Sequence, residues 1–253
     1  MVCPPRPYTP YQDGGYLIKD VKYHEGLFIP RPGYSKSTTL TKDNNIYDMV
    51  NNHMVTPFKV NKEVLDYLNR KGIEQNLLID TDTEYEYEKL PTLRPLQKRK
   101  LVSYNTKKIL QETIGGIADF YTKFSIFYFP VRLDQRGRLY CLPCYFNYPS
   151  SELSKALLQF VEPGIIKKTD KSSIQYFISY GVNCFVSIVA KQLLNKKLAW
   201  VEKNKENILS YENGYLLSKA SDKFLAFCIE YKRYIEFMED ENMMEFHTYY
   251  QFS

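Results

Sequence analysis

One short stretch of the chain combines an acid, two arginines and an aromatic side chain. Asp134 is followed by Arg136, Gly137, Arg138 and Tyr140. Arginine presents a planar guanidinium that pairs with phosphate through two parallel hydrogen bonds and keeps its charge at any working pH. Asp134 can hold one guanidinium by a salt bridge, so that the other arginine faces a ligand in a fixed orientation. These residue types suit contact with a phosphodiester backbone.

The glycine and the tyrosine of this stretch would complete such a site. Gly137 allows the backbone to turn tightly or to approach a ligand closely. Tyr140 offers a ring for stacking on a base and a hydroxyl for hydrogen bonding. The other interpretation is an ordinary turn with a surface ion pair, which contributes little to stability. The residues of this stretch alone leave both interpretations open.

The surrounding segments must position this stretch, and their hydrophobic periodicity predicts that most are helical after residue 56. An apolar face with helical spacing begins near Asn61, with Gly72 as its stop. A second face covers residues 109–124, and Gly115-Gly116 in its middle predicts close packing or a bend. The first 55 residues are rich in turn formers and predict loops with short strands. Further helical patterns cover residues 151–160, 172–195, 198–209 and 222–238.

Composition permits nucleic-acid binding without demanding it. The formal net charge is +5, and the hydrophobic and charged fractions of 44% and 25% are ordinary for a globular protein. A basic run over 94–108 and an acidic run over 80–88 are typical of solvated surface, although the basic run is also a candidate binding surface. Five cysteines without a secretory signal indicate reduced thiols in an intracellular compartment.

The chain is rich in aromatic residues, with 23 tyrosines and 15 phenylalanines against one tryptophan. Stacking on bases is one explanation for such an excess. An AT-rich genome, such as that of an organelle, is the other, because Tyr and Phe have AT-rich codons. The tyrosines are scattered rather than clustered, and this favours the genomic explanation.

A metal site is not favoured by the cysteines and histidines. Cys141 and Cys144 have the spacing of half a zinc site, but no second pair with suitable spacing follows. His24, His53 and His247 are scattered along the chain. We therefore expect no metal ligands among these residues.

The central block resembles the single-subunit, bacteriophage-type RNA polymerases, a family that includes mitochondrial enzymes and those of linear mitochondrial plasmids. Members carry an aromatic-aromatic-Pro element, then Asp-x-x-Gly-Arg, an aromatic residue two positions on, and an Asn shortly after. The corresponding residues here are Phe127 to Pro130, Asp134, Gly137, Arg138, Tyr140 and Asn147. The resemblance covers nearly the whole chain and is strongest to the plasmid type. Further segments similar to the family, in the family's order, are Met1–Pro5, Gly14–Leu17, Pro57–Leu65, Glu152–Phe160, Tyr180–Cys184, Glu202–Ile208 and Phe224–Tyr231.

The resemblance implies a fold and a set of contacts. The fold would be α+β, mainly α, as part of a right-hand polymerase. Residues 1–125 would form an N-terminal, thumb-proximal region with loops, short strands and a long helix, and residues 126–253 would begin the catalytic palm. The function would be template-dependent nucleotidyl transfer in mitochondrial transcription, with a DNA template and an RNA–DNA hybrid as partners. The residues expected to bind nucleic acid are Asp134, Arg136, Gly137, Arg138, Tyr140 and Asn147.

The chain also departs from the family. Members use two aspartates that hold two Mg²⁺ ions, together with a lysine and a tyrosine that select the nucleotide. The first aspartate is expected just after Glu245–Tyr249. The resemblance to the family ends there, and the residues that follow, Tyr250 to Ser253, contain no aspartate. Asp240 and Glu241 lie upstream in a charged run typical of surface.

These departures predict a truncated polymerase fragment. It would contain no catalytic or metal-binding residue and would be inactive without a missing C-terminal segment, and Mg²⁺ would be needed only by the complete enzyme. A start inside the family's chain points to the same conclusion, and a broken reading frame would explain both ends. The alternative is a non-catalytic nucleic-acid-binding or vestigial protein from a degenerate plasmid-derived gene.

Overall fold

The computed structural model describes residues 1–17, 27, 45–71, 93–134, 136–185, 188–218 and 221–249. Within these ranges the chain is mainly helical, with three small sheets of two antiparallel strands each. This composition agrees with the predicted α+β, mainly α class. None of the helices in the described ranges is long and apolar enough to cross a membrane.

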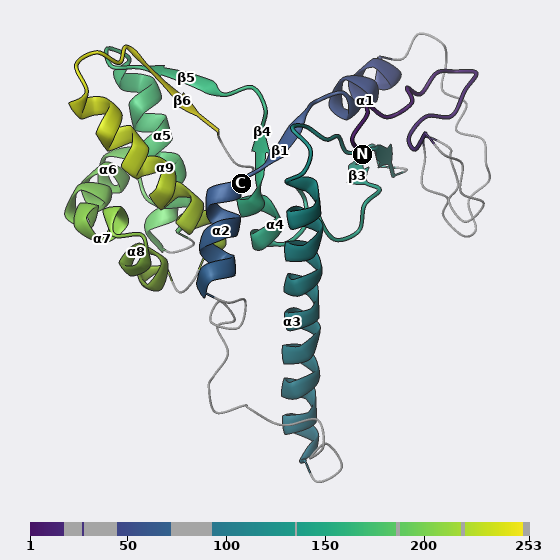
Figure 1. Cartoon of the computed structure of the whole chain (residues 1–253), viewed down its shortest axis with the longest axis horizontal. Coiled ribbons are helices and arrows are strands. Elements are labelled where there is room, and N and C mark those ends of the chain that lie inside the picture. Colours follow the sequence, from purple (N-terminus) through teal and green to yellow (C-terminus); the bar gives the residue numbers. More distant parts are fainter. Residues whose placement is uncertain are drawn as a thin grey trace.

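The helices and strands alternate irregularly along the chain (Figure 1). The helices are α1 (Ile46–Met54), α2 (Lys62–Lys71), α3 (Pro95–Tyr121), α4 (Glu152–Leu157), α5 (Lys171–Cys184), α6 (Leu194–Lys203), α7 (Lys205–Leu209), α8 (Glu212–Leu217) and α9 (Asp222–Glu239), with a 3₁₀ turn at Ile188–Lys191. The strands are β1 (Phe58–Val60), β2 (Val131–Leu133), β3 (Leu139–Cys141), β4 (Leu158–Phe160), β5 (Gly164–Lys167) and β6 (Glu245–Thr248).

The elements form two groups joined by a central region. Helices α5 to α9 lie together with the β5–β6 pair, and α1 lies on the other side of the molecule, where it contacts β2 (Figure 1). Between the groups, β1 pairs with β4, and α2 and α4 pack against α9. Helix α3 reaches this region with its C-terminal end and projects away from the body with the rest of its length (Figure 1).

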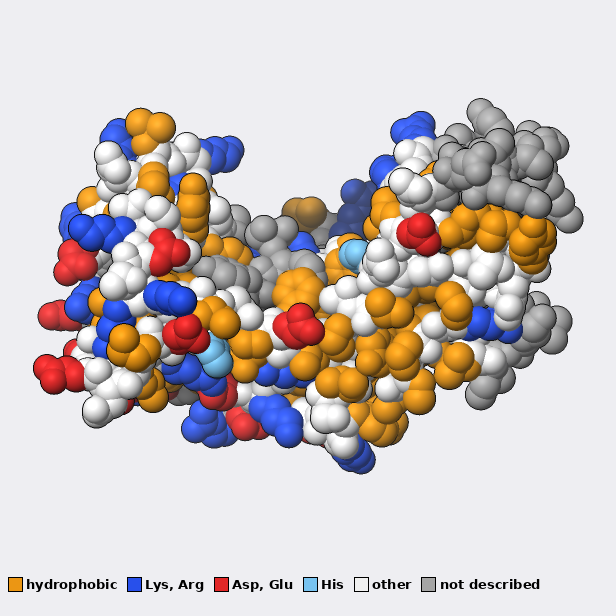
Figure 2. Space-filling model, turned by 90° about the horizontal axis from the view of Figure 1, so that it is seen from above, with side chains coloured by type: hydrophobic (Ala, Val, Ile, Leu, Met, Phe, Trp, Pro, Cys, Tyr) orange, Lys and Arg blue, Asp and Glu red, His pale blue; other side chains and the backbone are white. Residues whose placement is uncertain are grey.

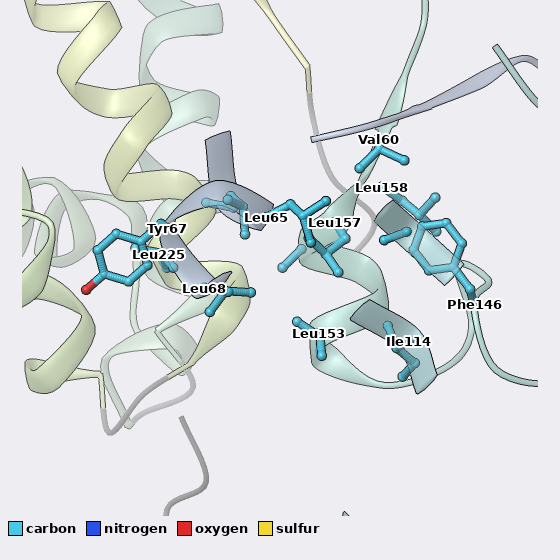
Figure 3. Packing of buried hydrophobic residues seen from close by; sticks show 14 of the residues in the cluster. Val60, Leu65, Tyr67, Leu68, Ile114, Phe146, Leu153, Leu157, Leu158 and Leu225 are labelled. Atoms are coloured by element: carbon cyan, nitrogen blue, oxygen red, sulfur yellow. The ribbon is translucent and has the colours of Figure 1, made fainter. Parts of the chain in front are cut away.

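Three buried clusters stabilise this arrangement. The largest joins α2, α3, α4 and α9 to β1 and β4, and some of its side chains appear in Figure 3. A second cluster fills the space between α5 and α9 and includes Phe246 from β6. A third packs Val50 and Met54 of α1 against Val131 and Leu133 of β2. The largest cluster draws residues from both sides of the predicted boundary at residue 125, and that boundary stays a prediction.

Several predicted helices are confirmed, with shifted ends. Helix α2 follows Asn61 as expected, α9 covers the last predicted pattern, and α3 contains most of the predicted 109–124 segment but begins at Pro95. Proline suits the first turn of a helix because the amide it lacks would have no partner there. Gly72 and the acidic run over 80–88 lie outside the described residues.

Other expectations were wrong. The predicted helix over 151–160 divides into α4 and β4, because Leu158–Phe160 pairs with β1. The first 55 residues contain a helix, α1, where only loops and short strands were expected. Of the close packing or bend predicted at Gly115-Gly116, close packing is not found at Gly116, where a Cβ would meet no described atom within 4 Å, and the bend stays a prediction.

Gly181 is a glycine that close packing between two helices requires. It lies in α5, and a Cβ at this position would come within 2.1 Å of the Phe227 ring of α9. We expect Gly181→Ala to lower the free energy of unfolding by about 1–3 kcal/mol in urea titrations, because overpacking outweighs the better helix propensity of alanine.

Gly116→Ala is the matched control for this substitution. It changes the same residue type within a helix, in open space, and should raise the free energy of unfolding by up to about 1 kcal/mol. Equal effects of the two substitutions would contradict the close approach of α5 to α9.

Candidate nucleic-acid interface

The stretch singled out from the sequence forms an antiparallel hairpin of β2 and β3. Val131 pairs with Cys141, and Leu133 pairs with Leu139. All three residues of β2 are buried, and Val131 and Leu133 belong to the cluster around α1. The base of the hairpin is therefore anchored in the core, while its turn reaches solvent.

The turn depends on Gly137. Its φ is +75°, in the left-handed region that glycine adopts without steric cost. The backbone N–H of Gly137 donates to the carbonyl of Asp134 at 3.0 Å, and the N–H of Asp134 donates to the carbonyl of Arg138 at 2.9 Å. A Cβ at Gly137 would meet no atom within 4 Å, so the requirement is conformational. Of the two predicted roles of Gly137, the tight turn is confirmed.

Asp134 organises the turn through both carboxylate oxygens. Oδ1 accepts the backbone N–H groups of Arg136 at 2.8 Å and Arg138 at 2.9 Å. Oδ2 accepts from Nε and Nη2 of Arg138, each at 2.6 Å. The backbone N–H of Arg138, followed by its guanidinium, holds the pKa of Asp134 below its usual value of 3.8, and the pair raises the pKa of Arg138. The predicted salt bridge thus forms, and Arg138 is its partner.

The tip of the hairpin presents both guanidiniums and one ring to solvent. The Arg138 side chain is 61% exposed although it is paired, and Asp134 behind it is only 17% exposed. The Arg138 guanidinium carbon lies 5.6 Å from the centroid of the Tyr140 ring, and this tyrosine is 39% exposed. Arg136 is exposed as well. An oriented cation and a ring side by side are the groups that contact phosphate and base in nucleic-acid binding.

Asn147 is placed differently from the other predicted residues. It is only 6% exposed, and its Nδ2 donates to the carbonyl of Pro143 at 2.6 Å. Its backbone N–H donates to Oγ of Ser154 at 3.4 Å. These contacts shape the loop between β3 and α4. The predicted contact of Asn147 with nucleic acid stays a prediction.

The described residues contain no group of three or more His, Cys, Asp or Glu side chains that could hold a metal ion. Cys141 is half-buried, and desolvation raises the pKa of its thiol to about 12. Asp240 accepts the backbone N–H of Asn242 at 2.9 Å and so stabilises a turn. We therefore assign no metal-dependent step to these residues, and the Mg²⁺ requirement of a complete enzyme stays a prediction.

Sequence reasoning missed several polar residues that meet away from the hairpin. Lys59 in β1 places its ammonium 3.4 Å from the ring centroid of Tyr249, and Gln159 in β4 lies opposite Lys59. The alternation of apolar and polar residues over Phe58-Lys59-Val60 was the available signal. It did not reveal the partner strand, which lies about one hundred residues further along the chain.

The hairpin geometry makes a prediction about Asp134. In ¹³C NMR titrations its carboxyl should titrate below 3.8, and Arg138→Ala should raise this pKa only partway, because alanine retains the backbone N–H that is the largest cause of the shift. Since the folded pKa is the lower one, the stabilisation from this carboxylate is present above its unfolded pKa and is lost as the pH falls through the folded value. Full return to 3.8 in the variant would show that the side-chain pair alone sets the pKa.

Comparison with known proteins identifies relatives of this chain. No protein-family model matches the chain. It is 38% identical over 253 residues to a probable DNA-directed RNA polymerase of Podospora anserina, covering 98% of the chain and 26% of that protein. It is 25% identical over 257 residues to T7 RNA polymerase of Escherichia phage T7, covering 91% of the chain and 28% of that enzyme. A chloroplastic DNA-directed RNA polymerase 3 of Nicotiana sylvestris is 26% identical over 250 residues, with coverages of 90% and 25%.

The relatives come from a fungus, a phage and a plant, and each matches nearly the whole chain. The chain itself spans about a quarter of the length of these relatives. It is therefore homologous to one section of the phage-type, single-subunit DNA-directed RNA polymerases.

Proposed function

We propose that the chain serves as a section of a DNA-directed RNA polymerase and that its β2–β3 hairpin contacts the nucleic-acid template. The pairing of Asp134 with Arg138 carries this proposal. It fixes the guanidinium at an exposed turn, next to the ring of Tyr140. A cation that is already oriented loses less conformational entropy when it pairs with phosphate.

The roles of the two arginines differ in this proposal. Arg138 is oriented by Asp134 and contacts a backbone phosphate beside the Tyr140 ring. Arg136 has its backbone N–H bound to Asp134, while its exposed side chain adds a second positive charge at the turn. Both contacts are with phosphate, so they give affinity and register rather than base specificity.

Helix α3 provides a second surface that suits binding of a polyanion. Its first half carries lysines and arginines and no acid, and it projects from the body of the molecule (Figure 1). In Figure 2 the molecule, seen from above, is hollowed between its two groups of elements. A positively charged projection raises the local concentration of a negatively charged strand. The cationic residues of this half and its N-cap are Arg94, Lys98, Arg99, Lys100, Lys107 and Lys108.

The finer features of the proposal rest on family resemblance. In a complete polymerase the chain would supply thumb-proximal and early palm regions of a right-hand fold, and a further segment would supply the aspartates that bind Mg²⁺. The proposed setting is mitochondrial transcription of a plasmid-type enzyme, with a DNA template and an RNA–DNA hybrid as partners. None of the relatives named above supports the alternative of a non-catalytic or vestigial protein.

Binding measurements on Arg138→Ala test the proposal. We expect the dissociation constant for a labelled single-stranded DNA oligonucleotide to rise about three- to tenfold at low salt, the effect of losing one charge-assisted contact. The slope of log affinity against log salt should become shallower by about 0.7, because one fewer phosphate is neutralised.

Lys203→Gln is the control for net charge. It removes one positive charge from an exposed position on α6, away from the hairpin, and should change the affinity little. Circular dichroism establishes that both variants are folded. If folded Arg138→Ala binds like the parent protein at every salt concentration, the hairpin is not the contact.

A further inference from the structure

A cavity of about 340 Å³ lies between segments that are far apart in the sequence. It is bounded by β1 and β4, by the first turn of α2, by α9 and by the chain just after α3. Its volume is in the range of small-molecule sites. The lining residues are Lys59, Val60, Asn61, Lys62, Glu63, Thr122, Phe124, Ser125, Gln159, Arg233 and Tyr249.

Strand pairing turns two polar side chains toward this cavity. Lys59 and Gln159 are direct partners in the antiparallel β1–β4 register, and both line the cavity. Their neighbours Phe58, Val60 and Leu158 point into the core, because successive side chains of a strand face opposite sides. The cavity wall therefore receives a cation and an amide from neighbouring strands.

Gln159 contributes an amide to the wall of the cavity. It is 7% exposed, and among the residues that the structure describes its side-chain amide makes no hydrogen bond. A polar ligand in the cavity would find a hydrogen-bond partner in this amide, which can both donate and accept.

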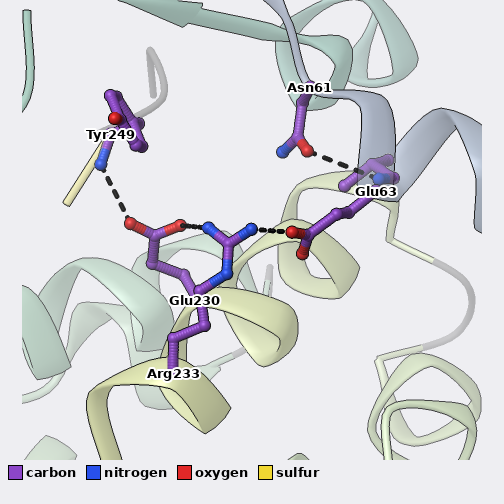
Figure 4. Close-up of polar contacts among 6 residues, drawn as sticks. Asn61, Glu63, Glu230, Arg233 and Tyr249 are labelled. Carbon is purple, nitrogen blue, oxygen red and sulfur yellow. Dashed lines mark hydrogen bonds and ion pairs between the residues drawn. The ribbon is translucent and has the colours of Figure 1, made fainter. Parts of the chain in front are cut away.

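The charges at the cavity favour a negatively charged ligand. Arg233 is held between Glu63 and Glu230, the second at 3.6 Å, so its positive charge is compensated and one carboxylate charge is in excess (Figure 4). Lys59 and Lys62 are the remaining cations of the lining. Glu230 faces Lys59 but also accepts the backbone N–H of Tyr249 at 2.9 Å, which engages it at the cavity edge.

We infer that this cavity binds a phosphate group, with Lys59 and Lys62 paired to its oxygens and the Gln159 amide donating to it. Lys59 covers the face of the Tyr249 ring at 3.4 Å, so that face is not open for stacking on a base, and recognition falls on the phosphate. The phosphate comes from a nucleic-acid strand or from a nucleoside triphosphate. The choice of these two sources rests on the proposed function, because a polymerase binds both a nucleic-acid strand and nucleoside triphosphates.

Two substitutions test the inference in the whole chain. Lys62→Gln removes an exposed cation that makes no packing contact in the core. We expect it to weaken binding of the phosphate-bearing probe about three- to tenfold. Gln159→Leu should weaken binding similarly while leaving the thermal midpoint close to that of the parent protein, because the two side chains are similar in size and no hydrogen bond to another described residue is lost.

The probes are a single-stranded DNA oligonucleotide, measured by fluorescence anisotropy, and ATP with inorganic phosphate as competitor, measured by calorimetry. Weakening of the oligonucleotide alone assigns the cavity to a strand phosphate, and weakening of ATP alone assigns it to a nucleotide. Unchanged affinity for both probes in both folded variants overturns the inference. So does an equal loss in Lys203→Gln, which would indicate an effect of net charge.

Arg138→Ala, measured beside these variants, separates the inference from the proposed function. If Arg138→Ala weakens oligonucleotide binding and the cavity variants weaken neither probe, the cavity inference fails and the hairpin role stands. The reverse pattern removes the hairpin role and supports the cavity.

Discussion

The arrangement of the molecule depends on hydrogen bonds that strand β1 makes on both of its edges. The N–H of Phe58 donates to the carbonyl of Phe127 at 2.8 Å, and the N–H of Phe127 donates to the carbonyl of Phe58 at 2.9 Å. On the other edge, β1 pairs with β4, where Phe58 lies opposite Phe160. The ring of Phe58 is buried against the rings of both partners, with centroids 6.5 and 5.4 Å away. One short strand thus joins three segments that are distant in the sequence.

The register of β1 also places both candidate binding surfaces. Phe127 leads directly into Phe129 and β2, so the bonds to Phe58 set where the hairpin begins. On the same strand, alternation places Lys59 toward the cavity and Phe58 and Val60 in the core. A slip by one residue would bury the lysine and expose two apolar side chains, which is why the register is strongly specified. The hairpin and the cavity are consequences of a single pairing.

Sequence periodicity predicted the helices better than the strands, for a physical reason. The apolar face of α9 repeats within one segment, so its burial can be inferred locally. The strands are three or four residues long, and their stability comes from partners far along the chain, which no local pattern reveals. Leu158–Phe160 illustrates this difference, since it continued a helical pattern but pairs with β1 instead.

The same distinction applies to the candidate sites. The pairing of Asp134 with Arg138 was predictable because both residues lie in one turn, where the spacing of four residues limits the geometry. The burial of Asn147 was not, since it depends on Pro143 and Ser154 folding around it. The cavity needed five separate segments to meet, and only the structure brings Lys59, Gln159 and Tyr249 together.

Asp134 and Glu230 each pair with an arginine, and their surroundings make them act differently. Glu230 is buried, so desolvation raises its pKa, and it links α9 to the residue after β6 by accepting the N–H of Tyr249. Removing one partner there would leave a buried charge uncompensated. Asp134 lies at the surface, where salt screens its pair with Arg138. Two of its hydrogen bonds come from backbone N–H groups, which salt screens less than the ion pair. The hairpin therefore keeps its shape at ionic strengths that weaken its contacts with phosphate, and binding at this surface is controlled by salt rather than by folding.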